Sequence, residues 1–77
     1  MGLPHRHRAY LRAVAHGRAE MTTNQVPDLF IDGLACCDQH TAHELAAQHL
    51  IAPSEPAERG ARVTAVLTDA GTTHLAA

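Results

Sequence analysis

Lysine and tryptophan are absent from the 77-residue sequence, and tyrosine and phenylalanine occur once each, as Tyr10 and Phe30. With so few of these rings, the core has to be built from aliphatic side chains, alanine and cysteine. That composition suits thin packing of helices on a small hairpin better than the walls of an enzyme cleft. A chain of this length also forms one domain with a small core. We therefore expect a single domain over residues 1–77, without a deep pocket.

Long apolar runs are also missing. No run reaches the roughly 20 residues of a membrane-spanning helix, and the segment from Met1 to Arg8 lacks the hydrophobic stretch of a signal peptide. We expect a cytoplasmic protein with no membrane partner. Its two cysteines, Cys36 and Cys37, are adjacent, and such neighbours rarely meet the geometry of a mutual disulfide. We expect both to be reduced thiols that pack as small hydrophobic side chains.

Positive charge is scarce, since the formal net charge is −2 and all six basic side chains are arginine. Because non-specific binding to nucleic acid depends on basic groups that neutralise phosphates, this balance argues against indiscriminate binding. The net charge does not exclude a local basic face. The most basic stretch is N-terminal and could hold backbone phosphates, or it could be a disordered solubilising segment; it consists of His5, Arg6, His7, Arg8 and Arg12.

The first half of the chain predicts a helix and a short extended piece. A helix from His5 to His16 begins beside Pro4 and ends at Gly17. Residues 19–23 tolerate strand geometry better than helix. The next segment, residues 24–34, is open to two interpretations: a short helix over residues 28–32, or a buried strand over residues 29–31 before a turn at 32–33. Both place the same side chains in the core, namely Leu29, Phe30, Ile31 and Leu34.

The second half predicts a capped helix and a hairpin. Asp38 is a good N-cap for a helix that extends to Leu50. One side of this helix packs and carries Thr41, Ala42, Leu45 and His49, while the other is free and carries Gln39, His40, His43 and Ala47. Residues 50–52 and 62–67 then form a two-stranded hairpin with a long tip. Thr68 or Asp69 caps a final helical turn that ends at Leu75.

Two stretches resemble the winged helix-turn-helix family, in particular its MarR-like branch. Residues 45–51, LAAQHLI, resemble the exit of the family's recognition helix, with His49 where glycine is usual. Residues 63–71, VTAVLTDAG, followed by Leu75, resemble the strand and helix start that close the wing. In this second stretch a glycine permits close approach of the helix to the wing. The resemblance implies an α+β winged helix with about three helices and a wing sheet of two or three antiparallel strands.

The resemblance also implies a regulator or accessory factor of bacterial type that binds double-stranded DNA. Its helix 38–50 would enter the major groove and present Gln39, His40, His43 and Ala47 to base edges. The wing, residues 53–62, would carry Arg59 and Arg62 to the backbone or minor groove. An ordinary solvated helix face, and local pairing of these arginines with Glu55 and Glu58, are the competing interpretations.

Other chemistry has less support in the sequence. Cys36, Cys37, His40 and His43 lie close enough to suggest a zinc site, but no second ligand pair occurs elsewhere, and we favour core thiols and surface histidines. Neither a nucleophile elbow nor a phosphate-binding loop is present, so we expect no enzyme activity and no cofactor.

The alternative function is a winged-helix module that binds a protein partner without DNA. DNA binding predicts that the arginines share one side with His40 and His43, whereas scattered arginines favour the protein-binding module. A homodimer is also considered, because two-fold assembly doubles the contacts of a small domain. The whole interpretation requires that Leu45 and Leu67 bury in a common interior.

Overall fold

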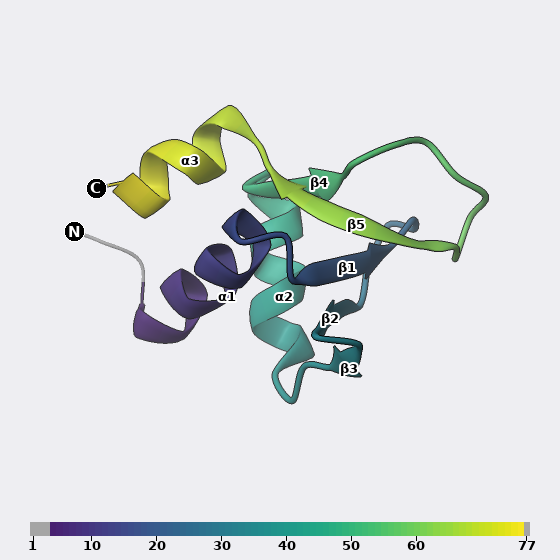
Figure 1. Cartoon of the computed structure of the whole chain (residues 1–77), viewed down its shortest axis with the longest axis horizontal. Coiled ribbons are helices and arrows are strands. Elements are labelled where there is room, and N and C mark those ends of the chain that lie inside the picture. The colour runs from purple at the N-terminus through teal and green to yellow at the C-terminus, as the bar shows by residue number, and fades with distance from the viewer. Residues whose placement is uncertain (1–3, 77) are drawn as a thin grey trace.

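The computed structural model describes residues 4–76 and has an α+β fold, as predicted. Figure 1 shows its elements, which are α1 (His5–Ala15), β1 (Ala19–Thr22), β2 (Leu29–Ile31), β3 (Leu34–Ala35), α2 (Gln39–Ala47), β4 (Ile51–Pro53), β5 (Arg62–Leu67) and α3 (Asp69–Ala76). Within the described residues, the strands form one antiparallel sheet in the order β3-β2-β1-β5-β4. This five-stranded sheet is larger than the two- or three-stranded wing sheet that the sequence predicts.

The two additional strands come from the middle segment that the sequence left open. The strand interpretation holds there, because β2 turns back into β3 through Asp32 and Gly33. Both turn residues have positive φ, 53° and 83°, which is the backbone of a two-residue hairpin with the right twist. Leu29 is buried as predicted. The placement of Leu34 in the core is wrong: β3 is one of the two edge strands, and Leu34 is 74% exposed.

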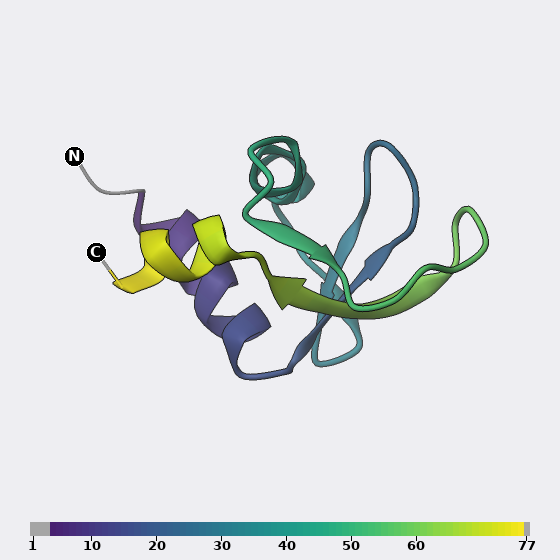
Figure 2. The same ribbon diagram turned by 90° about the horizontal axis from the view of Figure 1, so that it is seen from above.

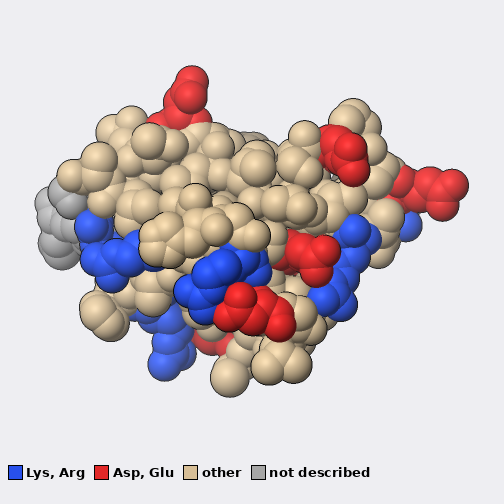
Figure 3. Space-filling view, viewed as in Figure 1, with Lys and Arg blue, Asp and Glu red and all other residues tan. Residues whose placement is uncertain are grey.

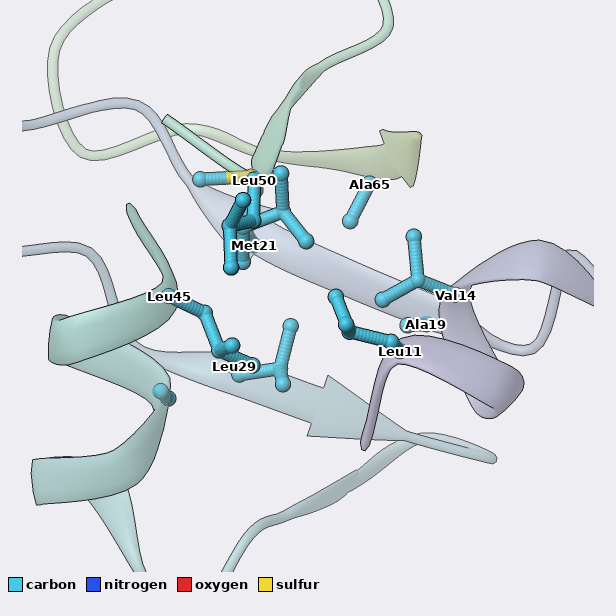
Figure 4. Close-up of a cluster of buried hydrophobic side chains, with 10 residues drawn as sticks. Leu11, Val14, Ala19, Met21, Leu29, Leu45, Leu50 and Ala65 are labelled. Atoms are coloured by element: carbon cyan, nitrogen blue, oxygen red, sulfur yellow. The ribbon is translucent and has the colours of Figure 1, made fainter. Parts of the chain in front are cut away.

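The core lies between α1, α2 and one face of the sheet. Figure 4 shows Leu11 and Val14 from α1 converging with Leu45 from α2 and with side chains of the strands. Leu45 is completely buried, and Leu67 packs against the same cluster from β5. The common interior that the sequence interpretation requires is therefore present.

Helix α2 is shorter than the sequence predicts. It ends at Ala47, and His49 takes a left-handed conformation with φ 58° at the position where the resembling family usually has glycine. The backbone N–H of Leu50 then donates to the carbonyl of Leu45, which satisfies a carbonyl at the helix end. The prediction of helix as far as Leu50 is wrong for this reason. His49 lies beyond α2 and is exposed, not packed.

The hairpin and the last helix follow the prediction closely. Strands β4 and β5 pair in the register Ile51↔Leu67, and the loop between them extends away from the helices, as Figure 2 shows. Thr68 caps α3, because its hydroxyl oxygen accepts a bond from the backbone N–H of Gly71 at 3.0 Å. Gly71 itself is buried against the backbone of Leu50. Helix α1 ends at Ala15, one residue earlier than predicted.

Candidate nucleic-acid interface

The start of α2 is fixed by Asp38. One carboxylate oxygen accepts from the backbone N–H of Thr41 at 3.0 Å, and the other accepts from the Thr41 hydroxyl at 2.6 Å. The guanidinium of Arg6 donates to the same carboxylate at 2.9 Å. These bonds, with those from Thr41 foremost, hold the pKa of Asp38 well below its usual range. Asp38 thus caps α2 and also joins it to α1.

The two sides of α2 differ as the sequence predicts, with exceptions at Gln39, the first residue of the helix, and at His49, which lies beyond its last residue. Thr41, Ala42 and Leu45 are buried. On the other side, the imidazole of His40 is 84% exposed and Ala47 is exposed. His43 is partly covered, and its Nε2 lies 3.5 Å from a carboxylate oxygen of Asp28. An outward surface of α2, formed by His40, His43 and Ala47, is therefore available to a partner.

Gln39 does not belong to that outward surface. Its amide oxygen accepts from the backbone N–H of Leu29 at 2.9 Å, and its amide nitrogen donates to the carbonyls of Leu29 and Cys36, both at 3.0 Å. The expectation that Gln39 lies on the free side of the helix is wrong, because the β2–β3 hairpin brings these backbone groups within its reach. Gln39 fastens α2 to the sheet and has no spare donor and acceptor pair for a base edge.

Glu44 adds a carboxylate to the outward surface of α2, between His40 on α2 and His7 on α1. One oxygen of its carboxylate lies 2.8 Å from Nε2 of His40, and the other lies 3.2 Å from Nε2 of His7. His7 is buried on α1, and its Nδ1 is a buried atom without a hydrogen-bond partner within the described residues. The predicted role of His7 in an exposed basic stretch does not fit this placement. The contact of Glu44 with His40 joins residues four apart on one helix and is visible in the sequence. Its contact with His7 is not, because His7 is 37 residues away.

The loop between β4 and β5 is attached to β1 through Thr23. The backbone N–H of Thr23 donates to the carbonyl of Ala61 at 2.9 Å, and its carbonyl accepts from Gly60 at 3.1 Å. The Thr23 hydroxyl donates to the carbonyl of Glu58. Arg59 follows in this loop and is exposed. The loop thus presents one arginine together with two carboxylates, those of Glu55 and Glu58.

Arg62 lies away from the loop tip, on the sheet face that the helices leave uncovered. Its guanidinium stacks 3.9 Å from the centroid of the Phe30 ring and donates to Glu20 at 3.1 Å. It also donates to the carbonyl of Gly33 at 3.3 Å. The expected alternative, pairing of Arg62 with Glu55 or Glu58, is wrong because strand register places Arg62 beside β1 and β2 instead.

The N-terminal arginines divide between two sides of α1. Arg6 faces α2 through its bond to Asp38. Arg8 donates to the carbonyls of His74 and Leu75, at 3.1 and 2.9 Å, and so satisfies the C-terminal end of α3. Arg12 is exposed and lies one helical turn after Arg8, on the same side. The predicted cluster is therefore ordered as helix, with His5 exposed at its start, but it does not form one basic surface.

Basic and acidic side chains are interspersed over the molecule. Figure 3 shows blue and red groups next to each other along one face, not a single basic patch. The bidentate pair of Arg18 with Asp32, at 2.6 Å for its shortest contact, lies at the β2–β3 turn and lowers the pKa of Asp32. The arginines are thus scattered, which is the arrangement that favours a protein-binding module over DNA binding.

The two thiols differ in their surroundings. Cys36 is half-buried against the core, and burial raises the pKa of its thiol, while Cys37 is exposed. The expectation that both thiols are packed is therefore wrong for Cys37. No three histidine, cysteine, aspartate or glutamate side chains in residues 4–76 gather closely enough to hold a metal ion. Over the same residues, every helix is too short or too polar to cross a membrane.

Comparison of the chain with models of known protein families, with curated proteins and with solved structures found no match.

Proposed function

We propose that this chain is a small winged-helix DNA-binding protein, a transcriptional regulator or an accessory factor. The observation that carries the proposal is the position of α2 beside β4 and the β4–β5 hairpin. Helix α2 contacts α1 and β4, and its Leu45 is buried in a core shared with β1 and β5. Together with the strand order β1-β5-β4 and the long β4–β5 loop, this arrangement supports the layout that the family resemblance implies. In this proposal the β2–β3 hairpin replaces the helix that usually precedes the recognition helix.

Contact with DNA would be made by the outward surface of α2 and by the loop. His40 and His43 can donate to guanine or to phosphate, and Ala47 can meet a thymine methyl. Arg59 would reach a phosphate or the minor groove from the loop. Glu44 and Asp28 lie beside the two histidines and oppose phosphate at neutral pH. We therefore expect modest affinity for DNA.

The test is a polarisation titration of the full chain against a random DNA duplex, at low and then moderate salt. Wild type should bind at low salt, and Arg59→Ala should reduce the slope of log affinity against log salt by about 0.9 if that arginine contacts one phosphate. Arg18→Ala is the matched control, because Arg18 is already paired with Asp32 at the β2–β3 turn. Its slope should equal that of wild type. Absence of binding at low salt removes DNA binding as the function.

A second candidate is a module of the same fold that binds a protein. The scattered arginines favour it: Arg8 is bonded to α3 and Arg62 to the outer sheet face, so neither shares a side with His40. A surface of mixed charge is typical of the rim of a protein interface. The same titration separates the two candidates, since the protein-binding module predicts no salt-dependent affinity for duplex DNA.

A further inference from the structure

Strand β3 leaves one edge of the sheet open. Among residues 4–76, no strand pairs with the side of β3 that faces away from β2. On the inner side, Leu34 is opposite Ile31 and Ala35 is opposite Phe30, and the backbone N–H of Cys36 donates to the carbonyl of Leu29 at 3.0 Å. Inward-pointing residues alternate along an antiparallel strand. Because Cys36 points its N–H inward, the N–H and C=O of Ala35 point outward along the open edge.

This edge, formed by a strand of only two residues, also lacks two of the features that normally prevent strands from associating. Such edges usually carry a charge or a proline, but residues 33–37, GLACC, contain neither. The opposite edge strand, β4, ends in Pro53. Leu34 is the most exposed large hydrophobic side chain within the described residues, at 74%. An open backbone edge and an exposed leucine therefore coincide at β3.

We propose that β3 is the surface at which two copies of this chain associate, by antiparallel pairing of β3 with β3 about a two-fold axis. An antiparallel edge is its own complement, because a two-fold axis brings identical donors and acceptors opposite each other. Ala35 supplies both outward groups and therefore lies opposite the partner's Ala35, with which it exchanges two hydrogen bonds. The pairing of Ala35 with the partner's Ala35 fixes the register of the two strands, and the association requires no protein other than a second copy of the chain.

The same register explains where Leu34 is buried. With Ala35 opposite the partner's Ala35, Leu34 is opposite the partner's Cys36, and opposite residues share a face of the sheet. Cys36 is half-buried at the margin of the core cluster. The exposed leucine of each copy thus covers the margin of the other copy's core, and the two sheets become one continuous sheet.

The first test is sedimentation of the full chain over a range of concentrations, under reducing conditions so that the exposed Cys37 forms no disulfide. Wild type should show a reversible monomer–dimer equilibrium. Leu34→Glu should raise the dimer dissociation constant by about tenfold or more, because two leucines lose their cover. Val26→Glu is the matched control: Val26 is 58% exposed but lies in the β1–β2 connection, so this variant should dimerise as wild type does. A wild-type chain that stays monomeric, or equal effects of the two variants, overturns the proposal.

The second test needs no variant. Hydrogen exchange of the Ala35 amide should slow as protein concentration rises, because the proposed pairing protects that amide only in the dimer. The Ala57 amide, in the β4–β5 loop, should exchange at a rate independent of concentration. An Ala35 rate that does not change with concentration overturns the proposal, even if the chain dimerises through another surface. Neither test depends on DNA binding.

Discussion

Replacement of Gly71 by alanine tests the packing of α3 on the hairpin. In an exposed helix this change is stabilising by about 1 kcal/mol, because alanine has the higher helix propensity. Here a Cβ atom at position 71 would lie 2.0 Å from the carbonyl oxygen of Leu50 and 3.3 Å from a methyl of Leu67. Backbone atoms cannot rotate out of the way as a flexible side chain can. We therefore expect the opposite sign.

The magnitude follows from the size of the clash. Contacts of Cβ closer than 3.0 Å are essentially never observed, so α3 must move by about 1 Å away from Leu50. That movement also stretches the bond from the Thr68 N–H to the Leu50 carbonyl, now 3.1 Å. Strain of this kind costs about 1–3 kcal/mol and a weakened hydrogen bond about 1 kcal/mol. After the gain in propensity, the free energy of unfolding should fall by about 2 kcal/mol.

Thermal and urea unfolding followed by circular dichroism measure this loss. For a domain of this size, about 2 kcal/mol corresponds to a fall in Tm of roughly 8–16 °C. Thr72→Ala, at the next and exposed position of α3, is the matched control and should leave Tm unchanged or slightly raised. If Gly71→Ala unfolds at or above the wild-type Tm, α3 does not pack on Leu50 as described.

Three further predictions concern Asp38, Arg8 and the thiols. Because the folded pKa of Asp38 lies below its unfolded value, its contribution to stability is complete above about pH 4 and is lost as pH falls through the folded pKa. Asp38→Asn should therefore be less stable than wild type at pH 7 and should lose less stability on acidification. Urea midpoints of the two proteins that change in parallel from pH 7 to about pH 2 would contradict this. Arg8→Ala should lower the free energy of unfolding by about 1 kcal/mol in urea titrations, since two carbonyls at the end of α3 lose their donor. Arg12→Ala, an exposed change on the same helix, should have little effect, and equal losses in the two variants would argue against the contact. A thiol reagent such as dithiobis-nitrobenzoate should modify the exposed Cys37 first and Cys36 slowly, because burial raises the pKa of the Cys36 thiol, and two equally fast thiols in the folded chain would refute this order.

Local signals in the sequence account for most of the elements. Gly17 ends α1, Asp38 begins α2 and Thr68 begins α3 through contacts with residues only a few positions away. The alternating pattern of residues 62–67 likewise identifies β5. The middle segment was undecided because a short apolar run between Pro27 and a turn suits either a helix or a strand. Pairing with β1 on one side and β3 on the other makes it a strand, and the apolar run itself carries no sign of these pairings.

The candidate site was less predictable, because its side chains are fixed by distant partners. Its helix position alone predicts that Gln39 faces solvent, but its side-chain amide is bonded to the backbone N–H and C=O of Leu29. Arg8 and Arg62 were expected to meet phosphate, yet they bind residues 67 and 42 positions away. Helical periodicity identifies which side of α2 is buried, and it does so correctly for Ala42 and Leu45. It cannot indicate which polar side chains already have partners.

The attachment of the β4–β5 loop to Thr23 limits where this chain tolerates changes in length. Residues after Glu58 are held to β1, whereas Glu55, Pro56 and Ala57 are exposed and separate that anchor from β4. Extra residues between 55 and 57 would lengthen the tip and leave the register of β5 unchanged. A fluorophore or an epitope tag can therefore be inserted there as a reporter without disturbing the remainder of the molecule.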